Sequence, residues 1–476
     1  MAELLSPSVN LLMYDLRNES GQTLEEIQEN RDLFAKKLPQ NAPPLAWNKD
    51  NQYNAEFVEL FGDRKQVGTL PVPHRDYQGY YYPVRMQNVY GLLLNCTVKD
   101  RSPLYSAALP GKIKSILEQV LQKQTGTLGQ TWIVSACAEA ITQTQTLALA
   151  RECYHNLFSG KHWDDNFIAS NRFLGGTLFE LESYDLTIPE NLEAAAWETW
   201  IAEKQVHNHH VLIAIYPNFE MLAASNYFMT DWMRIFCFRH KVLWNYTQAC
   251  LLKQLLESDL SKIQKYAENP SFINQLNRRR ELEGRWNTLR TVFLEYQIDL
   301  NYFKGKLNAI ASDLERYNQQ ADSMAETLIS ENLQNNAAFL DTFARNFKKN
   351  NLFLLRQDEE ILSDGLTLLE TTSNLLQGEM EVHKIKRDRA FQNTALAVGT
   401  GLGCGIATAT IVARGLESDE QQTDSILTTP VGQFLLQTFS VSPQWIVPAT
   451  AGLLSLTVAI VAASAVRLFL ALARQD

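Results

Sequence analysis

The stretch from Leu352 to Ala413 constrains the fold most, because it joins two physical environments and contains no proline. Its first half carries apolar pairs every seven residues, a period that keeps one stripe of a helix against a partner helix. The pairs are Leu354-Leu355, Ile361-Leu362, Leu368-Leu369 and Leu375-Leu376. Its second half, Ala390 to Ala413, has no charged residue. Since about 20 apolar residues cross a bilayer, we predict one helix that begins as a stalk in water and ends in lipid.

A line of polar residues runs between the two apolar lines of this predicted stalk. Its members are Asp358, Gly365, Thr372, Glu379, Lys386, Asn393 and Thr400. Such a pattern is typical of a helix that contacts a neighbour on either side and faces water in front, as in a ring of identical helices. On this hypothesis Glu379, Lys386, Asn393 and Thr400 line a pore. Alternatively, the leucines pack against the chain's own preceding helix and the polar line is the edge of a groove.

The end of the chain carries two predicted transmembrane helices, 390–413 and 445–466, the second followed by a short tail to 473. Basic residues precede the first helix and follow the second, and basic residues mark the cytoplasmic ends of spans. Both termini are therefore expected in the cytoplasm, at an inner or plasma membrane. The connecting segment 414–444 is predicted to be an acidic loop outside the membrane, with Glu417, Asp419, Glu420 and Asp424.

Small residues dominate the first predicted span. Gly399, Gly401, Gly403 and Gly405 form two overlapping G-x-x-x-G spacings, which let helix backbones approach closely in lipid. This density favours a homo-oligomer. The alternative is that the glycines pack one helical hairpin within a monomer.

Residues 1–218 alternate between short apolar runs and helical patterns, which predicts an α/β domain with a mixed sheet, on the cytoplasmic side. Runs that are apolar at successive positions are typical of strands covered on both faces. The expected strands are Val9–Leu16, Val89–Val98, Thr131–Cys137, Thr177–Tyr184 and Val211–Tyr216. The expected helices are Leu24–Lys37, Pro110–Lys123, Glu139–Phe158 and Asn191–Glu203, with loops at Pro39–Pro44 and Pro71–Pro83.

After Pro217 the strand patterns stop. A long helical region is predicted over 219–336, and the stalk helix over 337–389. The predicted fold class is therefore an N-terminal α/β domain, a long α-helical stalk or coiled coil, and two C-terminal transmembrane helices.

Composition excludes some function classes. The net charge of −10 argues against a nucleic-acid binder. The six cysteines have no C-x-x-C spacing, and the first residues lack a basic leader with a long apolar run, so we expect a reducing compartment and no signal peptide. No phosphate-binding or nucleophile-elbow motif occurs, and we predict that the chain is not an enzyme.

Three groups of residues are candidates for chemical sites. Cys137 follows a predicted strand, but a buried structural thiol is favoured over a nucleophile that would pair with His74. His207, His209 and His210 precede the VLIAIY strand, and a loop-exposed group is favoured over a metal site. His155 and His162 with Asp164 and Asp165 lack diagnostic spacing, so any metal site is unknown.

The order of these parts resembles the CorA-type metal-ion transporters and their ZntB-like relatives. The resemblance covers the layout of the whole chain and not its motifs: the family's Gly-Met-Asn signature is absent, and its place reads IVARGLESDE. The resemblance implies a pentamer whose first span lines the ion path. The expected function is then a homo-oligomeric cation channel, with a divalent cation as transported or regulatory ion and no cofactor. Two alternatives stay open: a membrane-tethered sensor or effector whose α/β domain binds an unknown ligand or protein, and a non-conducting scaffold.

Overall fold

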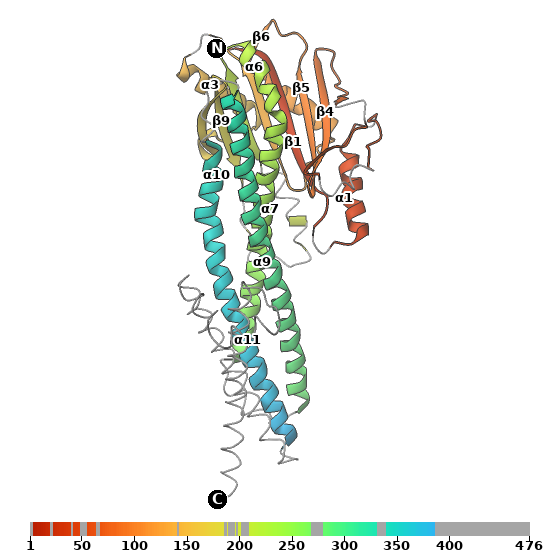
Figure 1. Ribbon diagram of the computed structural model, residues 1–476, viewed down its shortest axis with the longest axis vertical. Helices are drawn as coiled ribbons and strands as arrows, with labels where there is room; N and C mark the ends of the chain where they lie inside the picture. Colours follow the sequence, from red (N-terminus) through yellow and green to blue (C-terminus); the bar gives the residue numbers. More distant parts are fainter. Residues whose placement is uncertain are drawn as a thin grey trace, which may run out of the picture. The chain divides into compact units, whose positions relative to one another are not determined.

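The computed structural model describes residues 3–385 except 20–21, 40, 48–54, 63–66, 140–141, most of 185–208, 268–278 and 331–338. The described chain forms two compact units. Unit 1 comprises Met1–Glu257 and Ile298–Leu362, and a second unit continues from Ser258 and from Ser363. The predicted α/β domain with a mixed sheet, followed by long helices, is confirmed (Figure 1).

A mixed sheet of ten strands forms the centre of unit 1. Its order is β2-β4-β5-β1-β7-β10-β9-β8, with β3 paired to β4 and β6 to β1. The described ladders are antiparallel except that between β7 and β10, which is parallel. The strands are β1 Leu4–Leu16, β2 Phe57–Glu59, β3 Gly68–Thr69, β4 Tyr77–Met86, β5 Val89–Val98, β6 Leu104–Tyr105, β7 Gly129–Cys137, β8 Phe167–Phe173, β9 Gly176–Ser183 and β10 His209–Tyr216.

Helices cover both faces of the sheet, and longer helices follow it. In order they are α1 Leu24–Lys36, α2 Leu109–Val120, α3 Gln143–Leu157, α4 Trp163–Asn166, α6 Phe219–Ser225, the 3-10 turn η3 Asn226–Phe228, α7 Met229–Ala267, α9 Arg279–Ser330, α10 Leu340–Phe347, the π-helical turn η5 Lys348–Leu352 and α11 Phe353–Ile385. The long helices α7, α9 and α11 each continue from unit 1 into the second unit.

Strand β1 is buried on both faces, which explains the continuous apolar stretch at 11–14. Val9, Leu11 and Met13 belong to the core cluster that also contains the buried residues of α2 and α3. Tyr14 lies on the opposite face, where its hydroxyl donates to the Met233 carbonyl oxygen of α7 at 3.1 Å. Since successive side chains of a strand point to opposite faces, α2 and α3 cover one face and α7 covers the other.

Four of the five predicted strands agree with observed strands to within two residues, and β1 begins earlier, at Leu4. Strand β4 differs from the loop predicted at Pro71–Pro83, which covers its tyrosines and Pro83. The Pro83 carbonyl accepts from the Leu60 amide at 3.1 Å. In an antiparallel strand the N–H and C=O of one residue point to the same side, so the N–H that proline lacks would have pointed toward Leu60 and away from β5. The Leu60 carbonyl accepts instead from the Ala46 amide at 2.7 Å.

Local capping sets the start of two predicted helices. Thr23 and Glu26 form a reciprocal capping box at α1, as Thr142 and Gln145 do at α3. The prediction that α3 begins at Glu139 was therefore wrong by four residues. The helix predicted at Asn191–Glu203 lies largely outside the described residues.

The stalk pattern appears in α11, where the paired leucines separate into a buried and an exposed line. Leu355 and Leu362 are 4% and 2% exposed, whereas Leu354 and Ile361 are 57% and 63% exposed. Between the lines, Asp358 accepts from Lys253 of α7 at 2.7 Å. In this described part of α11, Asp358 of the polar line therefore contacts α7 of the same chain.

The same arrangement holds in the second unit. There a Cβ added to Gly365 would lie 2.8 Å from the Tyr296 hydroxyl of α9 and 3.0 Å from a Leu260 methyl of α7. The position after Asp358 in the polar line is thus closed by neighbouring helices of the same chain.

Most of the predicted membrane and pore residues fall outside the described part of the chain. Glu379 belongs to α11, but its side chain is not described; Lys386, Asn393, Thr400, the four glycines and the acidic loop residues lie beyond Ile385. Within residues 3–385, none of the described helices has the length and apolarity required to span a membrane. The predicted spans 390–413 and 445–466 lie outside that range.

Candidate functional site

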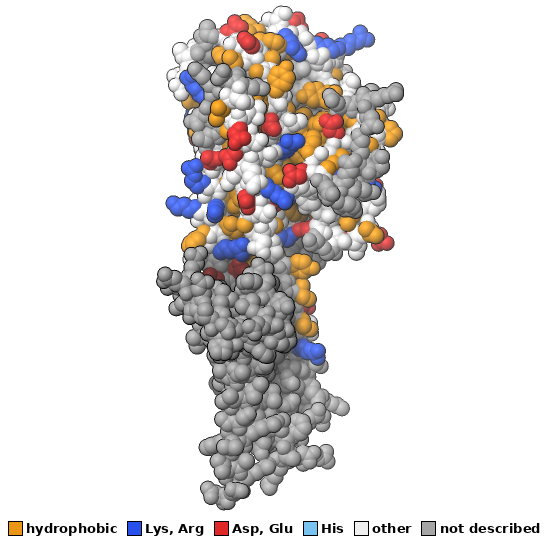
Figure 2. Space-filling model, in the orientation of Figure 1, with side chains coloured by type: hydrophobic (Ala, Val, Ile, Leu, Met, Phe, Trp, Pro, Cys, Tyr) orange, Lys and Arg blue, Asp and Glu red, His pale blue; other side chains and the backbone are white. Residues whose placement is uncertain are grey.

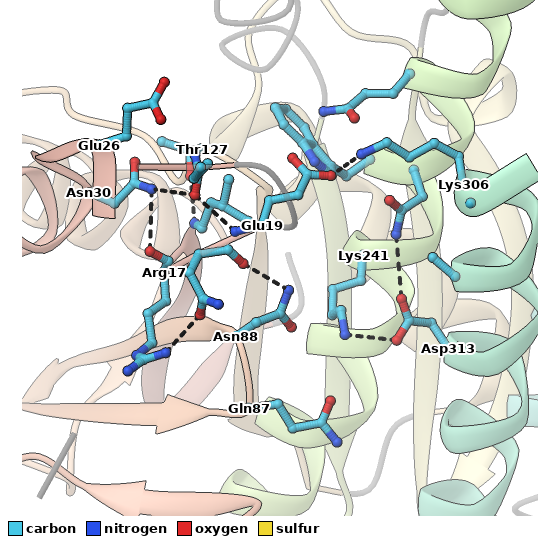
Figure 3. A pocket seen from close by; sticks show the side chains of 18 of the residues that line it. Arg17, Glu19, Glu26, Asn30, Gln87, Asn88, Thr127, Lys241, Lys306 and Asp313 are labelled. Carbon is cyan, nitrogen blue, oxygen red and sulfur yellow. Dashed lines mark hydrogen bonds and ion pairs between the residues drawn. The ribbon is translucent and has the colours of Figure 1, made fainter. Parts of the chain in front are cut away.

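A cleft of about 1720 Å³ lies in unit 1, between the sheet and the helices α7 and α9. One wall comes from α1 and from loops at one end of the sheet: the segment after β1, residues 55–56, the β4–β5 turn and residues 125–127. The other wall comes from α7 and α9 (Figure 3). None of these residues had been predicted as a site, because they are scattered from position 16 to position 316 and acquire a common location only in the folded chain.

One ion pair joins the two walls. The Glu19 carboxylate, after β1, accepts from the Lys306 ammonium of α9 (Figure 3). Lys306 is 13% exposed. Burial lowers the pKa of Lys306 to about 8.

A second polar group lies on the helical wall. Lys241 of α7 pairs with Asp313 of α9 at 2.8 Å, and the Asn245 amide donates to the other carboxylate oxygen at 3.5 Å. Burial raises the pKa of Asp313, while Lys241 and Arg316 oppose the shift. These contacts hold α7 and α9 together beneath the cleft.

A buried ion pair fixes the loop wall. The Lys37 ammonium lies 2.5 Å from Asp15 and donates to the Thr125 carbonyl at 2.6 Å. The same Asp15 oxygen accepts from the Thr127 amide at 2.8 Å. Since both charged side chains are at most 6% exposed, residues 125–127 are held rigidly against β1.

The helical wall leaves space for a ligand. On α9, a Cβ added to Gly305 would meet no atom within 4 Å, so the helix surface next to Lys306 is open. On α7, the indole N–H of Trp244 is buried beneath the cleft surface and has no hydrogen-bond partner, which is uncommon for a buried donor.

The turn between β4 and β5 carries local backbone strain. Gln87, which lines the cleft, has φ of +54°, a region that non-glycine residues rarely adopt. Glycine is the usual residue at such a position of a two-residue hairpin turn. The chain therefore keeps a glutamine side chain at the edge of the cleft at a conformational cost of about 1 kcal/mol.

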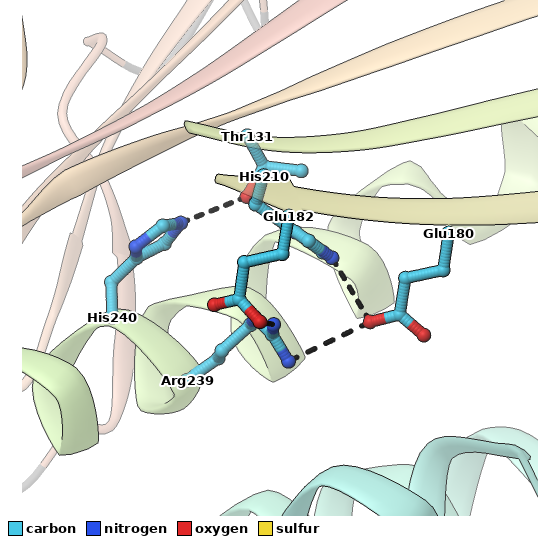
Figure 4. A network of polar contacts seen from close by, with 6 residues as sticks. All are labelled: Thr131, Glu180, Glu182, His210, Arg239 and His240. Atoms are coloured by element: carbon cyan, nitrogen blue, oxygen red, sulfur yellow. Dashed lines mark hydrogen bonds and ion pairs between the residues drawn. The ribbon is translucent and has the colours of Figure 1, made fainter. Parts of the chain in front are cut away.

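A separate buried network joins the sheet to α7 (Figure 4). The Arg239 guanidinium of α7, 1% exposed, lies 2.7 Å from Glu182 and 3.6 Å from Glu180, both on β9. Its other face lies 4.1 Å from the Phe343 ring of α10. Arg239 is therefore a charged anchor between β9, α7 and α10.

Two histidines extend this network through one hydroxyl. The Thr131 hydroxyl lies 3.1 Å from Nδ1 of His210 and 2.9 Å from Nε2 of His240, and Nε2 of His210 lies 3.1 Å from Glu180. With an ionised Glu180, the His210 Nε2–H donates to the carboxylate, so Nδ1 of His210 accepts from the Thr131 hydroxyl. A hydroxyl has one hydrogen to donate, and the Thr131 oxygen must then accept from His240 Nε2–H. Both rings are neutral in this scheme.

Burial favours the neutral form of both histidine rings. It lowers the pKa of both His210 and His240 well below the usual histidine value, and Arg239 lowers them further. Burial also raises the pKa of Glu180, with Arg239 opposing the shift. The network lies apart from the cleft lining, and we assign it to anchoring α7 on the sheet.

The histidine group predicted before the VLIAIY run is not exposed. His209 and His210 belong to β10, are 7% and 1% exposed, and as successive strand residues point to opposite faces. His209 stacks on Phe158 at 4.0 Å, while His210 joins the network. The loop-exposed interpretation was wrong for these two because β10 begins two residues earlier than predicted; His207 lies outside the described residues.

The other candidate residues have structural surroundings. Burial raises the pKa of the Cys137 thiol at the end of β7, the reverse of what activates a nucleophile. Asp164 pairs with Arg151 at 2.8 Å. Among the residues that the structure describes, no cluster of three or more histidine, cysteine or acidic side chains has the arrangement of a metal site. The five described cysteines are free thiols.

Comparison of the chain with protein-family models, curated proteins and solved structures found no match.

Proposed function

We propose that the chain is a membrane-tethered sensor or effector, in which ligand binding in the cleft of unit 1 controls the C-terminal membrane segments. The observation that carries this proposal is the cleft itself, because α7 and α9 form one of its walls and continue into the second unit. A ligand that parts or tightens the walls changes the packing of these helices.

The third long helix is tied to the same pair in unit 1. Besides the Lys253–Asp358 contact, Arg356 of α11 donates to the Asn308 side chain of α9 at 2.8 Å. Movement of α7 or α9 therefore acts on α11, whose sequence leads directly into the apolar segment 390–413. In this proposal, segments 390–413 and 445–466 are the anchor and the output of the protein.

Membrane attachment and control by the cleft are tested separately. For attachment, the full chain should remain in carbonate-washed membranes, whereas a chain ended at Arg389 should be released. For control, dye leakage from liposomes that contain the full chain is compared between wild type and Glu19→Gln, which removes the charge that joins the walls. A change in leakage supports the proposal. Equal leakage from correctly folded protein contradicts control by the cleft.

A cation channel of the CorA-like layout is the second candidate. It is favoured by the exposed line of α11, because Leu354 and Ile361 repeat at seven residues and are available to a neighbouring copy. In that case the copies form a homo-oligomer around a path lined by Asn393 and Thr400. Cation flux into liposomes that disappears on substitution of Asn393 or Thr400, but not of Thr372, would favour the channel.

A further inference from the structure

Acidic and basic side chains are nearly equal in number in the cleft lining. Of its described residues five are basic and six are acidic. Four of the basic side chains already contact an oxygen of the protein: Lys306 contacts Glu19, Lys241 contacts Asp313, Arg17 donates to Asn18, and Arg85 donates to the Gln87 carbonyl. Since the lining has no excess of basic side chains, its net charge does not favour an anionic ligand.

Side-chain amides are more numerous in the lining than groups of either charge. They come from both walls: Asn18, Gln22, Asn30, Gln87, Asn88, Asn245, Gln248 and Asn301. An amide side chain both donates and accepts hydrogen bonds, and so does a hydroxyl group. A site of this kind matches a ligand that carries many hydroxyls and no net charge.

Two aromatic residues give the cleft apolar surface beside these amides. Trp244 and Tyr302 both line it, and Tyr302 is 51% exposed. The C–H face of a sugar ring can pack on such flat rings.

The size of the cleft indicates more than a single sugar. Pockets for small ligands commonly measure roughly 300–1,000 Å³, and this one measures about 1720 Å³. On the face shown in Figure 2, acidic and basic side chains of unit 1 are interspersed, with no field of one sign. We infer that the cleft binds an uncharged polyhydroxylated molecule of oligosaccharide size. This inference deepens the proposed function and rests on it.

The strained turn supplies a variant that tests the inference without unfolding the protein. Gln87→Gly relieves φ of +54° and removes one amide from the cleft. Gln122 has φ of +53° and does not line the cleft, so Gln122→Gly is a matched control. Both variants should raise the thermal unfolding midpoint by about 1–3 °C. Only Gln87→Gly should weaken binding, by about tenfold.

Titration calorimetry on the full chain measures that binding, in a detergent without a sugar headgroup. The uncharged probes are maltotriose, raffinose, chitotriose and myo-inositol, and the charged probes are inorganic phosphate, AMP and citrate. We expect at least one uncharged saccharide to bind, to bind more weakly to Trp244→Phe, and to be excluded by Gly305→Leu, which fills the open space on α9.

The outcomes separate this inference from the proposed function. Binding of charged probes alone overturns the polyhydroxylated class and leaves a ligand-controlled protein. A saccharide that binds wild type, Gln87→Gly and Gly305→Leu equally is bound elsewhere and also overturns the inference. If no probe binds, the inference is overturned, and the leakage comparison with Glu19→Gln then decides the proposed function by itself.

Discussion

The carboxylate of Glu19 lies against the ammonium of Lys306, across a cleft that separates the end of a β-sheet from two long helices. These residues are 287 positions apart in the chain, and their contact joins the two walls directly. The pair is partly exposed, at 30% and 13%, so water screens it in part.

A double-mutant cycle measures this link. Glu19→Gln and Lys306→Met are made singly and together, and unfolding by urea is followed for each. We expect a coupling free energy of about 1 kcal/mol between the two sites. The control cycle uses Arg151 and Asp164, which are exposed by 48% and 78% and should couple less. Strictly additive effects at Glu19 and Lys306 would contradict a contact that holds the walls together.

The buried arginine should be among the most sensitive positions of the fold. Arg239→Met leaves Glu180 and Glu182 without their cation, and breaking a buried ion pair from one side costs about 3–5 kcal/mol. Arg151→Met, at an exposed ion pair, should change the unfolding free energy by less than about 1 kcal/mol. Denaturant unfolding of both variants checks the difference. Similar losses would show that Arg239 is not the anchor described above.

Stability should fall in mild acid because of the two buried histidines. Their pKa values are lowered in the folded protein, so below about 6.5 the unfolded chain binds more protons and stability decreases as pH falls. The slope should reach about 1.4 kcal/mol per pH unit for each histidine. Urea unfolding between pH 8 and pH 5 measures it.

Glu180 contributes to this pH dependence with the opposite sign. Its pKa is raised on folding, so above its unfolded value it destabilises the folded state, and that penalty shrinks as pH falls. In Glu180→Gln this opposing contribution is absent, and the acid slope should become steeper. A His210→Gln, His240→Gln double variant should have a flatter slope than wild type. An unchanged slope in both variants would place the acid sensitivity elsewhere.

Two helical glycines should respond in opposite directions to the same substitution. Gly305→Ala adds a methyl group into open space and should stabilise the protein by about 0.5–1 kcal/mol through helix propensity. Gly365→Ala brings its Cβ to 2.8 Å from the Tyr296 hydroxyl and should destabilise it. Thermal unfolding distinguishes the two. Stabilisation by Gly365→Ala would mean that α7, α9 and α11 do not pack as described.

The fold was more predictable than the site, for a physical reason. Strands such as Val89–Val98 can be predicted from the sequence, because burial on both faces favours apolar residues at successive positions. Strand β4 was not predicted because a proline normally argues against a strand. Pro83 is tolerated because the Leu60 carbonyl opposite it accepts from the Ala46 amide and needs no bond from Pro83. These signals are local in sequence.

The cleft gave no comparable signal. Glu19 and Lys306, or Gln87 and Trp244, become neighbours only through the order of the strands and the return of α9 beside the sheet. Their residue types are ordinary at a solvated surface, and no fixed spacing relates them. The positive φ of Gln87 could not be predicted either, because a Gln-Asn pair does not indicate a hairpin turn as Asn-Gly does.

The paired apolar residues of α11 do not determine the rotation of this helix about its own axis; its polar contacts do. A rotation of α11 about its own axis by one residue would bring Leu354 and Ile361 to the positions of Leu355 and Leu362. Almost the same apolar surface area would then be buried. The free energy of apolar burial alone is therefore nearly equal in the two orientations of α11. The Lys253–Asp358 ion pair and the Arg356–Asn308 hydrogen bond form in the observed orientation. These polar contacts, more than the leucines, therefore set the rotation of α11.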